Sequence, residues 1–188
     1  VFQSMAMVTC PAMRKMDYID EVTMTGTNSL RMIEYSISAT LMQVAIALLL
    51  GVWQALVILG ISFLTTITML LGLIAEKLRR RNIGLAWLAH IIGWFSMFGV
   101  WLILGRQFIF TIIESPNRPP AFVYAIVIVI ALLYSVFGFI QFYQLYKTDR
   151  IPEERLNIRV EMMYCVNSLV SKTFLGWMIF SNALVGVA

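Results

Sequence analysis

Residues 162–188, MMYCVNSLVSKTFLGWMIFSNALVGVA, form an apolar stretch with one charged side chain, Lys172, near its middle. A stretch of this length can cross a bilayer as a helix. An ammonium group at that depth costs at least ~2.5–3.5 kcal/mol, and such residues usually serve a function. The one acid comparably placed is Glu34, near the start of the apolar stretch 31–53, RMIEYSISATLMQVAIALLLGVW. This pairing indicates an imine-linked cofactor or an ion path, and we favour the cofactor.

The composition places the chain among membrane proteins. Of its 188 residues, 60% are hydrophobic and 13% are charged, whereas soluble domains carry about 25% charged residues. The distribution of Lys and Arg among the loops accounts for the net charge of +4, and we do not expect nucleic acid as a partner. Cys10 and Cys165 lack the spacing of a disulfide framework or a zinc site. The sequence also lacks a Ser–His–acid set and a phosphate-binding glycine loop, so we do not predict an enzyme.

Five apolar stretches are long enough for membrane helices, which need ~20 residues to cross ~30 Å of hydrocarbon. They lie at about 32–54, 56–76, 84–113, 121–146 and 160–187. Charged or proline-containing segments separate them, except that the first two meet at a tight turn near Gln54. The sequence therefore predicts an all-α membrane bundle over residues 30–188. Residues 1–10 are apolar but too short to cross, and we interpret them as the end of a helix that begins earlier in a longer protein.

Lys and Arg are unequally divided between the two sides of the predicted bundle. With five alternating spans, the amino-terminal segment and the loops at 77–82 and 147–159 share one side. That side carries eleven of the 14 basic residues: Arg14, Lys15, Arg31, Lys77, Arg79, Arg80, Arg81, Lys147, Arg150, Arg155 and Arg159. The opposite side carries Arg106 and Arg118. Because cytoplasmic loops are enriched in Lys and Arg, we predict that the eleven-charge side is cytoplasmic and the carboxyl terminus is outside.

The surroundings of Lys172 suit an amine that reacts with an aldehyde. Burial favours the neutral, nucleophilic amine, and the protonated imine that follows needs a carboxylate and hydroxyl groups nearby. Ser168 lies one turn before Lys172, and Ser38 lies one turn after Glu34. The simpler alternative is a lysine that snorkels to the interface or pairs structurally with Glu34. Snorkelling is disfavoured because about twelve residues, or ~18 Å of helix, separate Lys172 from the start of its span.

Aromatic residues recur along two other spans. Trp94, Phe98 and Trp101 follow helical spacing on the third span, and Tyr134 and Phe137 do so on the fourth. Such stripes usually reflect helix packing, although opposite a buried lysine they could wall a flat polyene.

Three polar residues in or beside these spans need partners. Gln141 continues the stripe of the fourth span and is unusual, because an amide in lipid requires a hydrogen-bond partner. We expect His90, the one histidine, to be a hydrogen-bonded packing residue. We expect Glu76 to pair with the adjacent basic cluster at 77–82.

Two motifs carry a resemblance to a known family. RMIEYSISATLM (31–42) resembles the third helix of heliorhodopsins, and NSLVSKTFLGW (167–177) resembles their seventh, retinal-bearing helix. The tight turn after the first span and the ending QFYQLYK (141–147) are also similar, so the likeness runs from about Asn28 to the end. It implies a rhodopsin-like seven-helix bundle of inverted orientation, of which five full transmembrane helices, three to seven, are present. Residues 1–29 would then be the end of helix two and a cytoplasmic loop.

The resemblance also implies roles for individual residues. Lys172 would hold all-trans retinal covalently as a Schiff base, Glu34 would be its counterion, and Arg31 would lie one turn before that acid. Serines would tune the hydrogen bonding, and further side chains would form the pocket. The full set besides Lys172 and Glu34 is Ser38, Ser168, Tyr35, Met42, Trp94, Phe98, Phe137 and Gln141. Ser168 and Ala45 stand where pumping rhodopsins carry carboxylates, which favours a light sensor over an ion pump.

Two other functions stay open. A light-gated channel or transporter on the same bundle would need more intramembrane polar residues than the sequence offers. A membrane subunit with a structural Glu34–Lys172 pair and no cofactor would be colourless. The predicted partners are retinal, the lipid bilayer and, by resemblance, a second copy in a homodimer; the sequence does not identify a signalling partner.

Overall fold

The computed structural model describes residues 22–114 and 121–185, and all regular secondary structure in those ranges is helical. Its long helices are α3 (Ser29–Leu49), α4 (Ala55–Leu78), α5 (Ile83–Glu114), α6 (Ala121–Lys147) and α7 (Glu153–Val185). The predicted all-α bundle is confirmed, and each predicted span falls on one of these helices. The segment predicted as the end of an earlier helix, 1–10, lies outside the described residues, so the proposed division of the chain near residue 29 stays a prediction.

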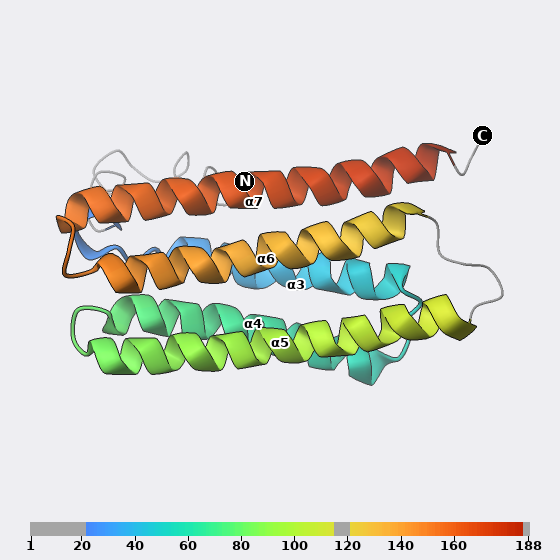
Figure 1. Cartoon of the computed structure of the whole chain (residues 1–188), viewed down its shortest axis with the longest axis horizontal. Coiled ribbons are helices and arrows are strands. Elements are labelled where there is room, and N and C mark those ends of the chain that lie inside the picture. Colours follow the sequence, from blue (N-terminus) through green and yellow to red (C-terminus); the bar gives the residue numbers. More distant parts are fainter. Residues whose placement is uncertain (1–21, 115–120, 186–188) are drawn as a thin grey trace.

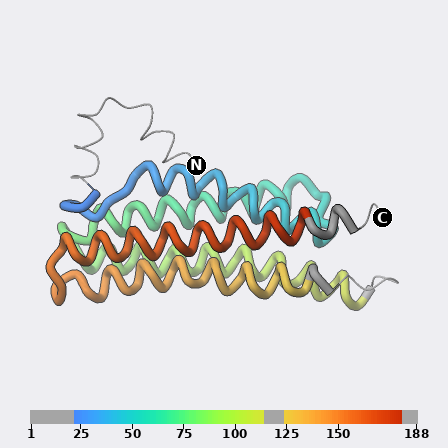
Figure 2. The backbone as a smooth tube through the Cα atoms, turned by 90° about the horizontal axis from the view of Figure 1, so that it is seen from above, coloured from blue at the N-terminus to red at the C-terminus, as the bar shows by residue number. Residues whose placement is uncertain are grey.

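The helices run side by side along one long axis (Figures 1 and 2). Each packs against the next in the chain, and α3 also contacts α6. Short connections make consecutive helices antiparallel, so the α4–α5 and α6–α7 loops lie at the end where α3 begins (Figure 1). The α3–α4 turn lies at the other end.

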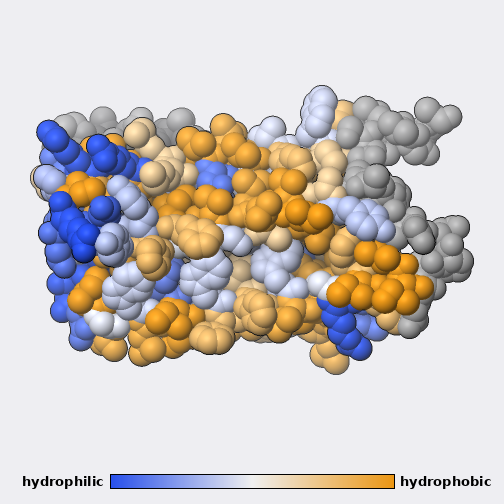
Figure 3. Space-filling view, in the orientation of Figure 1, coloured by the Kyte–Doolittle hydropathy of each residue, from blue (hydrophilic) through white to orange (hydrophobic). Residues whose placement is uncertain are grey.

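Hydrophobic side chains cover most of the visible bundle surface, and hydrophilic ones gather at the end with the α4–α5 and α6–α7 loops (Figure 3). Four described helices, α3 to α6, are long and apolar enough to cross a membrane. The fifth predicted span corresponds to α7, which is as long as α5 but is not among those four. Its polar residues Glu161, Asn167 and Lys172 lower its hydropathy, although it lies along the same bundle axis.

Local sequence explains where α3 begins and ends. The Asn28 side chain caps its start by accepting a hydrogen bond from Arg31 N at 2.9 Å. The predicted span continued to residue 54, but the helix ends at Leu49 because Gly51 adopts a left-handed conformation with φ 80°. Glycine has no Cβ and takes that conformation without strain. The turn thus places α4 directly beside α3.

Candidate functional site

Lys172 on α7 and Glu34 on α3 form an ion pair. The distance from Lys172 Nζ to Glu34 Oε1 is 2.8 Å. The Glu34 side chain is 13% exposed and that of Lys172 is 36% exposed. Lys172 Nζ also lies 5.4 Å from the centre of the Tyr35 ring, on its face. The fold therefore brings the lone mid-span lysine to the candidate acid, a contact that sequence position alone did not establish.

A small cavity lies beside this pair. It is lined by Lys172 and by five other residues predicted for the pocket, namely Tyr35, Ser38, Met42, Phe137 and Ser168, together with Ala39, Met69, Tyr134 and Ser171. Two tyrosines fix the neighbouring backbones: Tyr35 Oη donates to Tyr164 O at 3.1 Å, and Tyr134 Oη donates to Ala39 O at 2.9 Å. These bonds tie α3 to α7 and to α6 around the cavity.

A second, larger cavity continues from the first. The two share Tyr35, Met69, Tyr134 and Phe137 as lining residues. At its far end the larger cavity is lined by Trp94 and Gln141, which were also predicted for the pocket, and by His90. Its other lining residues are Met32, Thr68, Gly72, Gly93, Met97, Gly138 and Tyr164. Together the cavities form an aromatic and methionine-rich path that leads from Lys172 across α3, α4, α6 and α5.

Phe98 does not join this site. Its side chain is 60% exposed and lines neither cavity. The inward face of α5 is carried instead by Trp94 and Met97, together with Val100 and Trp101 in the core. A spacing of four residues from Trp94 fits one helical face, but a position at the edge of that face is turned outward by the way the helix packs.

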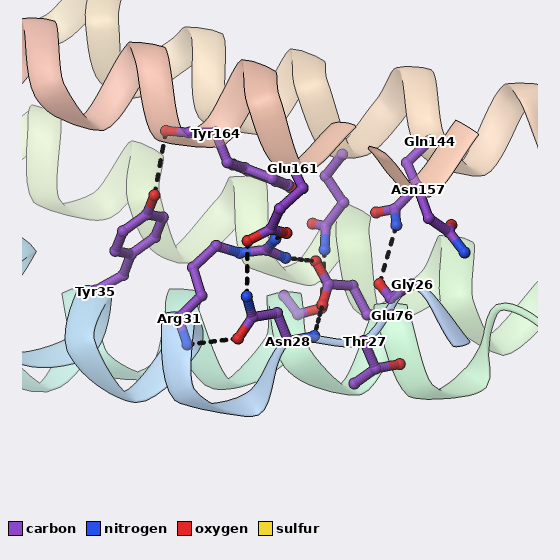
Figure 4. Close-up of polar contacts among 12 residues, drawn as sticks. Gly26, Thr27, Asn28, Arg31, Tyr35, Glu76, Gln144, Asn157, Glu161 and Tyr164 are labelled. Carbon is purple, nitrogen blue, oxygen red and sulfur yellow. Dashed lines mark hydrogen bonds and ion pairs between the residues drawn. The ribbon is translucent and has the colours of Figure 1, made fainter. Parts of the chain in front are cut away.

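A buried charged cluster lies at the start of α3 (Figure 4). Arg31, which is 1% exposed, forms ion pairs with Glu76 of α4 and Glu161 of α7. Asn28 Nδ2 donates to Glu161 Oε1 at 2.7 Å, and the Arg31 guanidinium lies 4.2 Å from the centre of the Tyr164 ring. The expectation that Glu76 pairs with the basic cluster beside it is wrong, because the carboxylate is turned into the bundle.

The basic cluster at 77–82 itself is divided between interior and surface. Arg79 is buried and donates to Asn157 Oδ1 at 2.9 Å and to Thr25 O at 3.3 Å. Burial lowers the pKa of its guanidinium, and the nearby Glu153 carboxylate offsets part of that lowering. Arg80 forms an exposed ion pair with Glu153. Little in the sequence indicated the roles of Glu161, a polar residue at the start of a predicted span, and of Asn157, which was predicted to lie in the loop before that span but belongs to α7.

No group of three or more His, Cys, Asp or Glu within residues 22–114 and 121–185 is arranged to hold a metal ion. A family model described as Heliorhodopsin matches residues 2–184 of this chain. A search of curated proteins found no match.

Proposed function

The chain belongs to the heliorhodopsin family of retinal-binding, light-sensing membrane proteins, and from that premise we propose how its own residues hold the chromophore. Lys172 carries all-trans retinal as a protonated Schiff base, and Glu34 is the single counterion. The observation that supports this most directly is the 2.8 Å contact between the Lys172 amine and the Glu34 carboxylate beside the first cavity. Bound retinal supplies the absorption of visible light and the isomerisation that follows.

The residues around the amine fit such a group. A primary amine condenses with an aldehyde, and one carboxylate at hydrogen-bond distance balances the positive charge that protonation restores. Aromatic rings and the flexible side chains of Met42 and Met69 line the path beyond it, and methionine adapts its shape to a ligand. Serine hydroxyls at Ser38 and Ser168 supply hydrogen-bonding groups near the imine.

We propose a light sensor and not an ion pump. Pumping needs a chain of titratable groups leading away from the chromophore. Among the described residues that line the cavity at Lys172, three are serines and none is a carboxylate. Glu34 alone would then accept charge changes at the imine, which suits a slow structural response to light.

We also propose the orientation and assembly. The end of the bundle that carries the α4–α5 and α6–α7 loops faces the cytoplasm, and the carboxyl terminus lies outside. The support is the gathering of hydrophilic side chains at that end (Figure 3) together with the charge bias of cytoplasmic loops. Family membership supports a homodimer.

The test is a visible spectrum of the membrane-expressed chain after addition of all-trans retinal, before and after hydroxylamine under light. We expect a visible band that hydroxylamine bleaches and that is lost in Lys172→Ala. Lys147→Ala, which removes a lysine at the end of α6, is the matched control and keeps the band. A band that survives Lys172→Ala would rule out this attachment site. A colourless wild-type protein would contradict the proposal for this chain.

A further inference from the structure

Three hydrogen bonds link α5, α6 and α4 at the far end of the larger cavity. Trp94 Nε1 donates to His90 Nε2 at 3.0 Å, and His90 Nδ1 lies 2.9 Å from Gln141 Oε1. Gln141 Nε2 then donates to Gly72 O at 2.8 Å. The last two of these hydrogen bonds give the Gln141 amide the partners that it requires among apolar neighbours.

The first donor and the last acceptor fix the donor-to-acceptor direction of all three hydrogen bonds. An indole N–H is only a donor, so His90 Nε2 must be an acceptor without a hydrogen. Gly72 O is only an acceptor, so the Gln141 amide presents its nitrogen to α4 and its oxygen to His90. His90 Nδ1 therefore carries the hydrogen and donates it to Gln141 Oε1. One arrangement satisfies all three bonds, and in it His90 is the neutral Nδ1–H tautomer.

The surroundings of His90 favour this neutral state. The ring is 5% exposed, and its other neighbours are the rings of Trp87 at 5.9 Å and Phe142 at 6.4 Å between centroids. None of the groups in contact with it from α5 or α6 carries a charge. An imidazolium would present hydrogens on both nitrogens, so it would lose the bond from Trp94 and leave a buried charge without a counterion.

The Trp94 indole also has little freedom to move. A Cβ atom added at Gly138 would lie 2.7 Å from Trp94 Cε2, so the indole packs directly on the backbone of α6. Both Trp94 and Gln141 line the cavity. Trp94 is therefore held between His90 and Gly138, and Gln141 between His90 and Gly72 O.

We propose that His90 is a positioning residue: as the neutral Nδ1–H tautomer, it fixes Trp94 and Gln141 as the wall at the end of the retinal pocket remote from Lys172. This inference rests on the proposed function, because it takes the two cavities as the retinal site. His90 acts on the chromophore only through the two side chains that it holds.

The experiment compares His90→Phe, Trp94→Phe and their double variant with the wild type. Two readouts are used: the visible absorption maximum with retinal, and the vibrational signature of the hydrogen-bonded Trp94 indole with and without retinal. We expect each single variant to shift the maximum, and the double variant to shift it by less than the sum of the two single shifts, because both single variants remove the bond between Trp94 and His90. His90→Phe should also abolish the Trp94 signature. Trp87→Phe, which alters a ring contact of His90, is the control and keeps that signature.

Gly138→Ala gives a second test that leaves His90 unchanged. The added methyl group displaces the indole, and we expect the shift seen in Trp94→Phe; Gly105→Ala, where no atom lies within 4 Å of the added Cβ, should cause none. Additive shifts, or an unchanged Trp94 signature in His90→Phe, would overturn the inference. The vibrational readout decides this even in a colourless protein, so failure of the retinal assignment and failure of the His90 assignment are distinguished.

Discussion

At the scale of single residues, Lys172 and Glu34 meet although they lie at different distances from the starts of their helices. Both α3 and α7 begin at the end with the α6–α7 loop (Figure 1), and Lys172 lies further along its helix than Glu34 does. Side chains on a helix lean toward its amino terminus, and the four methylene groups of lysine give it reach. Part of the difference is the earlier start of α7, since Arg31, the third residue of α3, pairs with Glu161, the ninth of α7. The lysine side chain then extends back toward the carboxylate of Glu34.

Glu34→Gln tests the role of this carboxylate. A carboxylate stabilises the ground state of a protonated imine, so we expect the visible band of the variant to move to longer wavelength. We also expect the imine to lose its proton more readily, because the charged form no longer has an anionic partner. The effect should be smaller than for a fully buried pair, because Lys172 is 36% exposed and solvent screens the interaction.

A pH titration of the absorption spectrum measures both effects. Glu154→Gln, which removes an exposed carboxylate at the start of α7, is the control and should titrate like the wild type. An unchanged spectrum and titration in Glu34→Gln would assign the counterion to another group.

At the scale of helices, the Arg31 cluster fastens the start of α3 to α4 and α7. Arg31 and Glu76 are almost fully buried, with side-chain exposures of 1% and 0%. Arg80, just after α4, and Glu153, at the start of α7, form a second arginine–glutamate pair that is exposed, at 40% and 43%. Because both are arginine–glutamate pairs, they show how burial changes what such a pair contributes to stability.

Arg31→Met should destabilise the protein far more than Arg80→Met. Removing Arg31 leaves two carboxylates without their cation, which costs about 3–5 kcal/mol for a buried pair, whereas an exposed pair contributes less than about 1 kcal/mol. Equilibrium unfolding of the detergent-purified variants measures the difference. Adding Glu76→Gln to Arg31→Met should recover part of the loss, because it removes one unpaired charge. Equal losses for the two arginine variants would contradict this view of the cluster.

At the scale of the whole molecule, the proposed orientation can be tested by chemical labelling. Asn82 lies in the α4–α5 loop and Gln54 in the α3–α4 turn, at opposite ends of the bundle, and both are exposed. In a Cys10→Ser, Cys165→Ser background, a membrane-impermeant maleimide should label Gln54→Cys in intact cells. It should label Asn82→Cys only after the membrane is permeabilised. The reverse pattern would place the basic loops outside.

The sequence by itself determined the class of protein and the approximate bounds of the five long helices among the described residues, and it led to Lys172 as the predicted site of cofactor attachment. These follow from composition, from apolar runs ended by charges and prolines, and from one charge amid apolar neighbours, all of which are local along the chain. Turn chemistry could refine one bound, because Gly51 ends α3 earlier than the apolar run does.

Only the tertiary structure decided which faces of the helices meet. It turned Phe98 outward, paired Glu76 with Arg31, and joined His90 to Trp94 and Gln141. In a membrane bundle both the protein core and the lipid are apolar, so hydrophobic periodicity barely distinguishes the buried face from the exposed one. The rotation of each helix about its axis is set by packing against its neighbours, and polar partners on different helices become visible only when that packing is known.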